Sequence, residues 1–77
     1  MYSKEIENTD LNKARQSLIE ETEAIEWYER RIFETRDKEL RKILEHNRNE
    51  EKEHLAMIVE WIRKHDKEQD LKFREHD

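Results

Sequence analysis

Not one of the 77 residues is a glycine or a proline, and this limits the folds open to the chain. Tight turns rely on these two residues more than on most others, and both destabilise helices when they fall inside them. A chain that contains neither has few places at which to reverse direction. We therefore expect a nearly all-helical fold with long segments and very few turns.

A first helix is expected over about residues 10–36, with Thr9 or Asp10 as its N-cap. Apolar residues recur there every seven positions, at Leu11, Leu18, Ile25 and Ile32. The companion positions three residues later hold Ala14, Glu21 and Tyr28. This spacing is typical of a helix with one apolar face, and Glu21 occupies a position where leucine would be expected.

A second helix is expected over about residues 38–66, with Asp37 as its cap. Its apolar stripe follows spacings that alternate between four and three, at Leu40, Leu44, Asn47, Glu51, His54, Ile58, Trp61 and His65. An amide, a carboxylate and an imidazole thus lie within a stripe that should face the core. Residues 67–76 can form a short third helix through Leu71 and Phe73, or can fray.

The link between the two long helices is only about two residues, so they should fold back as an antiparallel hairpin. We interpret residues 1–77 as a single domain whose hairpin has too little core to stand alone. Cysteine is absent, which leaves self-association, metal or both as sources of stability. We expect an all-α fold in which two hairpins, at least a homodimer, pair into a four-helix bundle.

Charged residues make up 48% of the chain, but their signs are mixed and the net charge is only −5. This balance argues against a nucleic-acid-binding surface. The longest apolar run, residues 55–59, is far too short to span a bilayer, and the N-terminal residues carry no apolar segment of a secretory signal. We expect a cytoplasmic protein that binds neither membranes nor nucleic acid.

Glu21 lies midway along the first helix, and Glu51 and His54 lie near the middle of the second. In an antiparallel hairpin these levels roughly coincide, and residues three apart share one helix face. Two hairpins would gather four carboxylates and two imidazoles, and two divalent cations would balance the four negative charges. One Glu from each of two helices, with Glu-x-x-His from each of the other two, is the di-iron or di-manganese carboxylate pattern of ferritin-like four-helix bundles, and we expect the paired hairpins to form such a bundle. Zinc can also be accepted by such ligands.

Two other interpretations of these polar residues stay open. Glu-x-x-His pairs arise often by chance in a chain this charged, and a polar layer with Asn47 can simply set the register of a structural oligomer. The residues could also form a zinc or manganese site that performs no turnover.

Three neighbouring residues have both a functional and a structural interpretation. Tyr28 follows Glu21 by two turns and can donate a hydrogen bond to a metal-bound group, or can be an ordinary core tyrosine. Glu20 and Glu23 can attract ferrous ions toward the centre, or can be solvated surface.

The segments EETEAIEWYER (20–30) and ILEHNRNEEKEH (43–54), with Ala56-Met57 and EWIR (60–63), resemble the encapsulated ferritins over roughly residues 17–66. The resemblance implies helical hairpins that pair around a di-iron ferroxidase centre at the dimer interface. The implied metal ligands and catalytic residues are Glu21, Glu51 and His54 from each of two chains, with Tyr28 and Trp27 close by. Glu20 and Glu23 match positions where metal enters the centre.

The same resemblance implies an activity and partners. Family members oxidise Fe(II) to Fe(III) for iron storage or detoxification, assemble from dimers into an annular decamer, and work in the lumen of an encapsulin shell. Iron is therefore the expected metal, with manganese or zinc able to substitute. Encapsulated members commonly end in a shell-docking peptide, and no such segment is recognised before Asp77.

Overall fold

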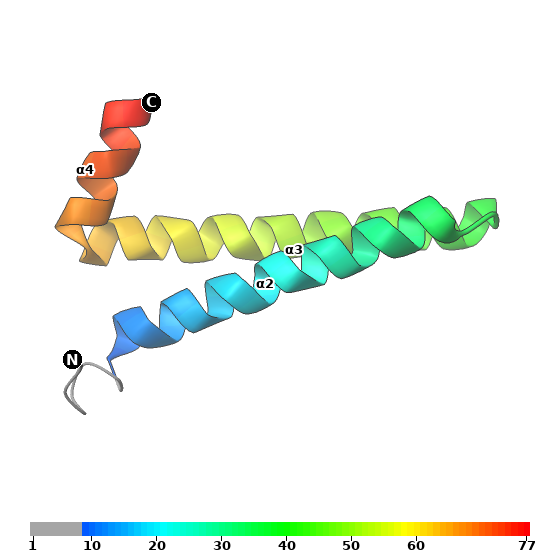
Figure 1. Cartoon of the computed structure of the whole chain (residues 1–77), viewed down its shortest axis with the longest axis horizontal. Helices are drawn as coiled ribbons and strands as arrows, with labels where there is room; N and C mark the ends of the chain where they lie inside the picture. Colours follow the sequence, from blue (N-terminus) through cyan, green and yellow to red (C-terminus); the bar gives the residue numbers. More distant parts are fainter. Residues whose placement is uncertain (1–8) are drawn as a thin grey trace.

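A computed structural model of the chain describes residues 9–77. This part contains three helices and no strand: α2 spans Asp10–Glu34, α3 spans Lys38–His65, and α4 spans Lys67–His76. α2 and α3 form the long arms of a hairpin, and α4 projects from its open end (Figure 1). The prediction of an all-α helical hairpin is confirmed.

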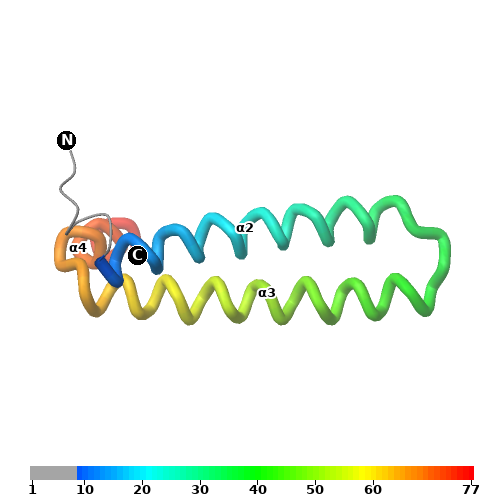
Figure 2. The backbone as a smooth tube through the Cα atoms, turned by 90° about the horizontal axis from the view of Figure 1, so that it is seen from below, coloured from blue at the N-terminus to red at the C-terminus, as the bar shows by residue number. Residues whose placement is uncertain are grey.

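Side-chain caps fix where the two long helices begin. The Thr9 hydroxyl accepts a hydrogen bond from the Asn12 N–H at 3.2 Å, and the Asp37 carboxylate accepts one from the Leu40 N–H at 2.9 Å. Thr35 has an extended backbone, with φ −74° and ψ 142°, so α2 ends at Glu34 rather than near residue 36. Only residues 35–37 separate the helices, which run antiparallel side by side (Figure 2).

The core of the hairpin is very small. Among residues 9–77 only Leu44 and Ile62 are buried, with 8% and 4% of their surface exposed. The other apolar positions of the two faces are half-buried or exposed, because each helix has only one helical neighbour along most of its length. The large apolar side chains left exposed include Ile19, Trp27, Phe33, Leu40, Ile43, Met57, Leu71 and Phe73. Leu40 was expected in the seam that faces the core, but 45% of it is exposed.

Asp66 sets the junction between α3 and α4. Its backbone N–H closes α3 on the Ile62 carbonyl, and its carboxylate caps α4 by accepting from the Gln69 N–H at 3.0 Å. The other carboxylate oxygen lies 2.6 Å from Nη2 of Arg15, on α2. Asp66 has an extended backbone, so the chain leaves the axis of α3 and α4 points steeply away from both long helices (Figure 1).

Within the described part of the chain, no helix has a stretch long and apolar enough to cross a membrane.

Candidate metal centre

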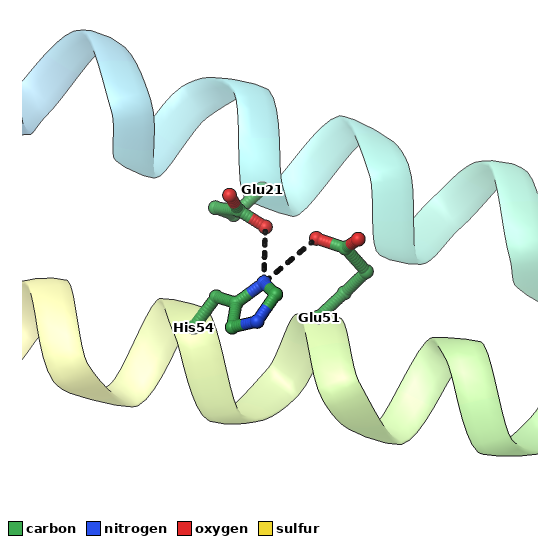
Figure 3. A group of neighbouring side chains, drawn as sticks. All are labelled: Glu21, Glu51 and His54. Atoms are coloured by element: carbon green, nitrogen blue, oxygen red, sulfur yellow. Dashed lines mark ion pairs between the residues drawn. The ribbon is translucent and has the colours of Figure 1, made fainter.

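Three potential metal ligands meet midway along the hairpin. Glu21 extends from α2, and Glu51 and His54 extend from α3 toward it (Figure 3). Glu51 and His54 are three residues apart, so they lie on one face of α3. Because α2 and α3 are antiparallel and the link is short, the middles of the two helices lie at the same level. The structure thus brings together the three residues that the sequence placed in the seams.

The three side chains lie close enough together that they could hold a metal ion. His54 Nδ1 lies 3.7 Å from Glu21 Oε2 and 3.6 Å from Glu51 Oε2. One ligand atom from each of the three residues lies within 4.8 Å of the others, and residues 9–77 contain no other such group of three. Two carboxylate oxygens and one imidazole nitrogen are donors that suit ferrous iron, manganese and zinc.

Of the three residues, Glu21 is the one whose negative charge is disfavoured by its surroundings. Its Oε2 is buried and has no hydrogen-bond partner. The Glu51 carboxylate raises the pKa of Glu21, chiefly because a protonated Glu21 can share a hydrogen bond with it. Burial and the negative charge of Glu51 raise this pKa further, while His54 opposes the shift. Without a cation, Glu21 therefore holds a proton more tightly than an exposed glutamate does.

One side of the group is open. The His54 side chain is 48% exposed, whereas those of Glu21 and Glu51 are 24% and 23% exposed. Met57, three residues beyond His54 on α3, is 61% exposed. The side of the group that carries His54 and Met57 is therefore accessible to solvent in the single chain.

Tyr28 follows Glu21 by two turns on α2 and makes no hydrogen bond to the three candidate ligands. Its ring is half-buried and meets Trp27 edge to face, with ring centroids 5.5 Å apart. Its hydroxyl has no hydrogen-bond partner within residues 9–77, and its role as a donor to a metal-bound group stays a prediction. Trp27 is 48% exposed, and the guanidinium carbon of Arg31 lies 3.1 Å from its ring centroid.

Glu20 and Glu23 lie apart from the three ligands, on the exposed surface of α2. The Glu20 carboxylate accepts a hydrogen bond from the Gln16 side chain at 3.4 Å. Glu23 borders a shallow apolar hollow that also involves Ile19 and Glu26. Neither carboxylate belongs to a group that could hold a metal ion within the described chain.

Sequence reasoning missed a cross-helix clamp near the centre. Arg48 Nη1 of α3 lies 2.8 Å from Glu29 Oε1 of α2, and the guanidinium lowers the pKa of Glu29, chiefly through this hydrogen bond. Arg48 precedes Glu51 by three residues, so the clamp joins the helices one turn from the ligands. The sequence does place opposite charges beside the two apolar stripes at matching levels, and this pattern could have predicted the ion pair.

The other histidines that the structure describes in the long helices have local partners. His46 Nε2 lies 3.3 Å from Glu50 Oε1, one turn away. The His65 ring stacks on Trp61, with centroids 4.0 Å apart, and its Nδ1 lies 2.8 Å from the Trp61 carbonyl oxygen. Neither histidine joins a group of metal ligands.

Comparison with known proteins gives concordant matches. The profile of a family described as EncFtn-like matches residues 3–76. A "Ferritin-like protein" of Thermotoga maritima is 54% identical over 55 residues, which are 71% of this chain and 48% of the relative. An "Encapsulated ferritin-like protein" of Rhodospirillum rubrum is 46% identical over 70 residues, which are 91% of this chain and 47% of the relative. The chain thus spans about half the length of these two curated relatives.

A solved structure has the same fold. The crystal structure of protein ne0167 from Nitrosomonas europaea superposes with a TM-score of 0.85 at 46% sequence identity. The match covers 96% of this chain and 79% of that one. The hairpin with its projecting third helix is therefore also found in an experimentally determined protein.

Proposed function

The chain belongs to the EncFtn-like family of encapsulated ferritin-like proteins, and from this premise we propose that it is a ferroxidase. Its substrates would be ferrous ions, bound in pairs between two copies of the hairpin, and dioxygen. The ligands would be Glu21, Glu51 and His54 of each copy, with manganese or zinc able to occupy the same positions. The product, ferric iron, would be stored or detoxified.

The observation that carries this proposal is the buried Glu21 oxygen without a partner, facing a second carboxylate and an imidazole. A purely structural polar layer would satisfy its buried groups with hydrogen bonds. Here Glu21 lies where ionisation is costly, because the neighbouring Glu51 carboxylate and burial raise the pKa of Glu21. A divalent cation removes that cost and accepts all three donors at once.

The site would be completed by a second copy. One chain offers two carboxylates and one imidazole, and two chains would offer the four carboxylates and two imidazoles that hold two metal ions in four-helix bundles. The open flank beside His54, with the exposed Met57, is the surface on which the second hairpin would pack. Further assembly of such dimers into a decamer is part of the proposal and rests on the family alone.

The residues of the chain would have distinct tasks. His54 Nδ1 faces both carboxylates, so its lone pair would bind the metal while Nε2 carries the proton. Glu21 would release its more tightly held proton when iron arrives, and the flexible carboxylates of Glu21 and Glu51 would hold the two ions close together. Ferrous iron supplies the electrons that reduce dioxygen. Glu20 and Glu23 would collect ferrous ions at the surface, and Tyr28 would contact the centre only once two chains have paired.

The name of the R. rubrum relative supports a place inside a compartment. We accordingly propose that the chain works in the lumen of an encapsulin shell, where the ferric product accumulates. Co-purification with a co-expressed encapsulin would support this location. Recovery of empty shells alongside free protein would contradict it without affecting the ferroxidase proposal.

The direct test is the growth of ferric absorbance after Fe(II) is added in air to the purified protein, compared with a buffer blank. Fast growth that saturates at about two irons per dimer is expected. A trace no faster than the blank would overturn the ferroxidase proposal. If zinc or manganese still bound in that case, the centre would be a metal-binding module without turnover, and if no metal bound, it would be a structural layer.

A further inference from the structure

We infer that the cross-helix clamp, the ion pair between Arg48 and Glu29, positions the ligands of the metal centre. Neither residue belongs to the group of candidate metal ligands found within residues 9–77. The clamp acts through the helices, because it holds α2 and α3 at the level where the ligand from α2 meets the two ligands from α3. The inference rests on the proposed function, since it needs a centre that binds metal.

The ligands themselves do not hold the two helices at this level in the state that binds metal. His54 Nδ1 lies 3.7 Å from Glu21 Oε2 and 3.6 Å from Glu51 Oε2, and both distances are longer than a hydrogen bond. Metal binding requires ionised carboxylates, and two ionised carboxylates repel each other until the cation arrives. Contacts outside the centre must therefore keep the ligands together.

Apolar packing alone does not fix this level. The buried residues of the described chain are Leu44 and Ile62, which lie on α3 on opposite sides of the centre. Hydrophobic contacts are non-directional, so they hold helices together without selecting one alignment strictly. An ion pair that is also a hydrogen bond has a preferred distance and angle, and it can select the alignment.

The cross-helix clamp has the geometry for this task. Nη1 of Arg48 lies 2.8 Å from Oε1 of Glu29, which is the distance of a charge-assisted hydrogen bond. The Arg48 side chain is only 22% exposed, and its Nε donates to Asn49 Oδ1 at 3.2 Å, which limits how far the guanidinium can turn. Arg48, chiefly through its hydrogen bond, and also Lys52 lower the pKa of Glu29. The Glu29 carboxylate therefore stays ionised and attracted to α3.

Its place along the hairpin distinguishes the clamp from two other arginine contacts between the arms. Arg41 Nη2 donates to the Thr35 carbonyl at 2.6 Å, beside the hairpin link. Arg15 lies 2.6 Å from Asp66 at the open end. The clamp lies one turn from the ligands on α3. A shift of α2 along α3 by the rise of one residue, about 1.5 Å, would carry the α2 ligand away from its partners and break the clamp at the same time.

Two uncharged variants separate positioning from a simple effect of charge on metal affinity. Glu29→Gln removes an anion near the bound cation and Arg48→Gln removes a cation, so their charges alone would change the affinity in opposite directions. Positioning predicts that both variants weaken Zn(II) binding, by about fivefold, which is the scale of a partly exposed ion pair. The double variant should bind no more weakly than either single variant, because the two residues act as one pair.

Isothermal titration calorimetry with Zn(II) measures the affinity, and His54→Ala defines the binding that occurs elsewhere on the surface. Glu26→Gln is the matched control, because it breaks an ion pair with Arg30 within α2 and should leave the affinity unchanged. Circular dichroism confirms that each variant stays helical.

Unchanged affinity in both Glu29→Gln and Arg48→Gln, or changes in opposite directions, would overturn the inference and leave the proposed function intact. A parent protein that binds no Zn(II) at this centre would overturn the proposed metal centre and the inference together. Absence of iron oxidation alone would leave the test valid, because Zn(II) binding requires no turnover.

Discussion

His54 of α3 faces Glu21 of α2 across the hairpin, with Nδ1 and Oε2 3.7 Å apart. Glu51 stands at a similar distance from the same nitrogen. The contact therefore joins the two long helices through groups that carry opposite charges only when the imidazole is protonated. A metal ion would hold the same three groups more tightly and would leave the imidazole neutral.

Replacing Glu51 or His54 with Ala should slow iron oxidation by more than about a hundredfold. The reason is that loss of a metal ligand reduces activity more than loss of a group that only supports a ligand. The helices should persist in both variants, since neither side chain is buried. Stopped-flow absorbance of the ferric product measures the rate. His46→Ala is the matched control, because His46 pairs only with Glu50 on the surface. Parent-like rates in either ligand variant would show that the site is assigned wrongly.

Glu21→Gln should stabilise the metal-free protein at neutral pH while abolishing metal binding. The amide keeps the shape of the Glu21 side chain but removes its negative charge. That charge is unfavourable in the metal-free protein, because Glu51 and burial raise the pKa of Glu21. Thermal unfolding in EDTA should give a higher melting temperature than the parent. Titration with Zn(II) or Mn(II) should give no tight binding. A lower melting temperature in EDTA would mean that the Glu21 charge does not destabilise the fold.

The same shift predicts how the stability of the metal-free chain depends on pH. The folded state holds the Glu21 proton more tightly than the unfolded state does. In the unfolded state the pKa of Glu21 is near 4.5. The free energy of unfolding should therefore fall as the pH rises from about 4.5 through the raised pKa of the folded state. Urea unfolding in EDTA across this range measures the slope. The Glu21→Gln variant should lose this component of the slope, and an identical slope in both proteins would exclude Glu21 as its source.

Met57→Glu should reduce iron oxidation without touching a ligand. Met57 is 61% exposed three residues beyond His54, on the flank where the second hairpin would pack. A carboxylate buried there would oppose pairing of the chains. Native mass spectrometry with Fe(II) should show fewer metal-bound dimers, and the rate of oxidation should fall in proportion. Met57→Leu, which keeps the apolar surface, is the control, and full activity in Met57→Glu would place the interface elsewhere.

Asp66→Ala should loosen α4 and leave the hairpin intact. The substitution removes the cap on the Gln69 N–H, which contributes about 1 kcal/mol in typical helices. Amide hydrogen exchange in residues 68–76 should accelerate about fivefold. Asp66→Asn separates the two roles, because its amide oxygen still caps α4 while the ion pair with Arg15 is weakened. Equal exchange rates in the Ala variant and the parent would show that the cap does not hold α4.

Hydrophobic periodicity located the helices and the candidate centre, and the reason is physical. Each long helix has one neighbour, so its apolar face follows a simple repeat, and a polar residue in that repeat is visible as an exception. Glu21, Glu51 and His54 were found as such exceptions. The antiparallel link then required them to lie at one level, which needs no knowledge of side-chain conformations.

Contacts outside the repeat were not predictable in this way. Arg48 with Glu29, and Arg63 with Asp70, join residues whose helices approach at angles that the repeat does not encode. The projection of α4 depends on the extended backbone of Asp66, a residue that gives no turn signal as strong as glycine or proline. Exposure of Leu40 likewise depends on which positions a second chain would cover, and a single sequence contains no direct record of that.

Because Leu44 and Ile62 are the only buried residues in the described chain, we expect folding to be coupled to encounter with a partner. The melting temperature should then rise with protein concentration, as it does for chains without a stable folded monomer. A newly made copy that meets no partner would remain open to proteolysis. The amount of assembled protein would consequently grow faster than the rate of its synthesis, so the chain would accumulate only above a threshold of expression.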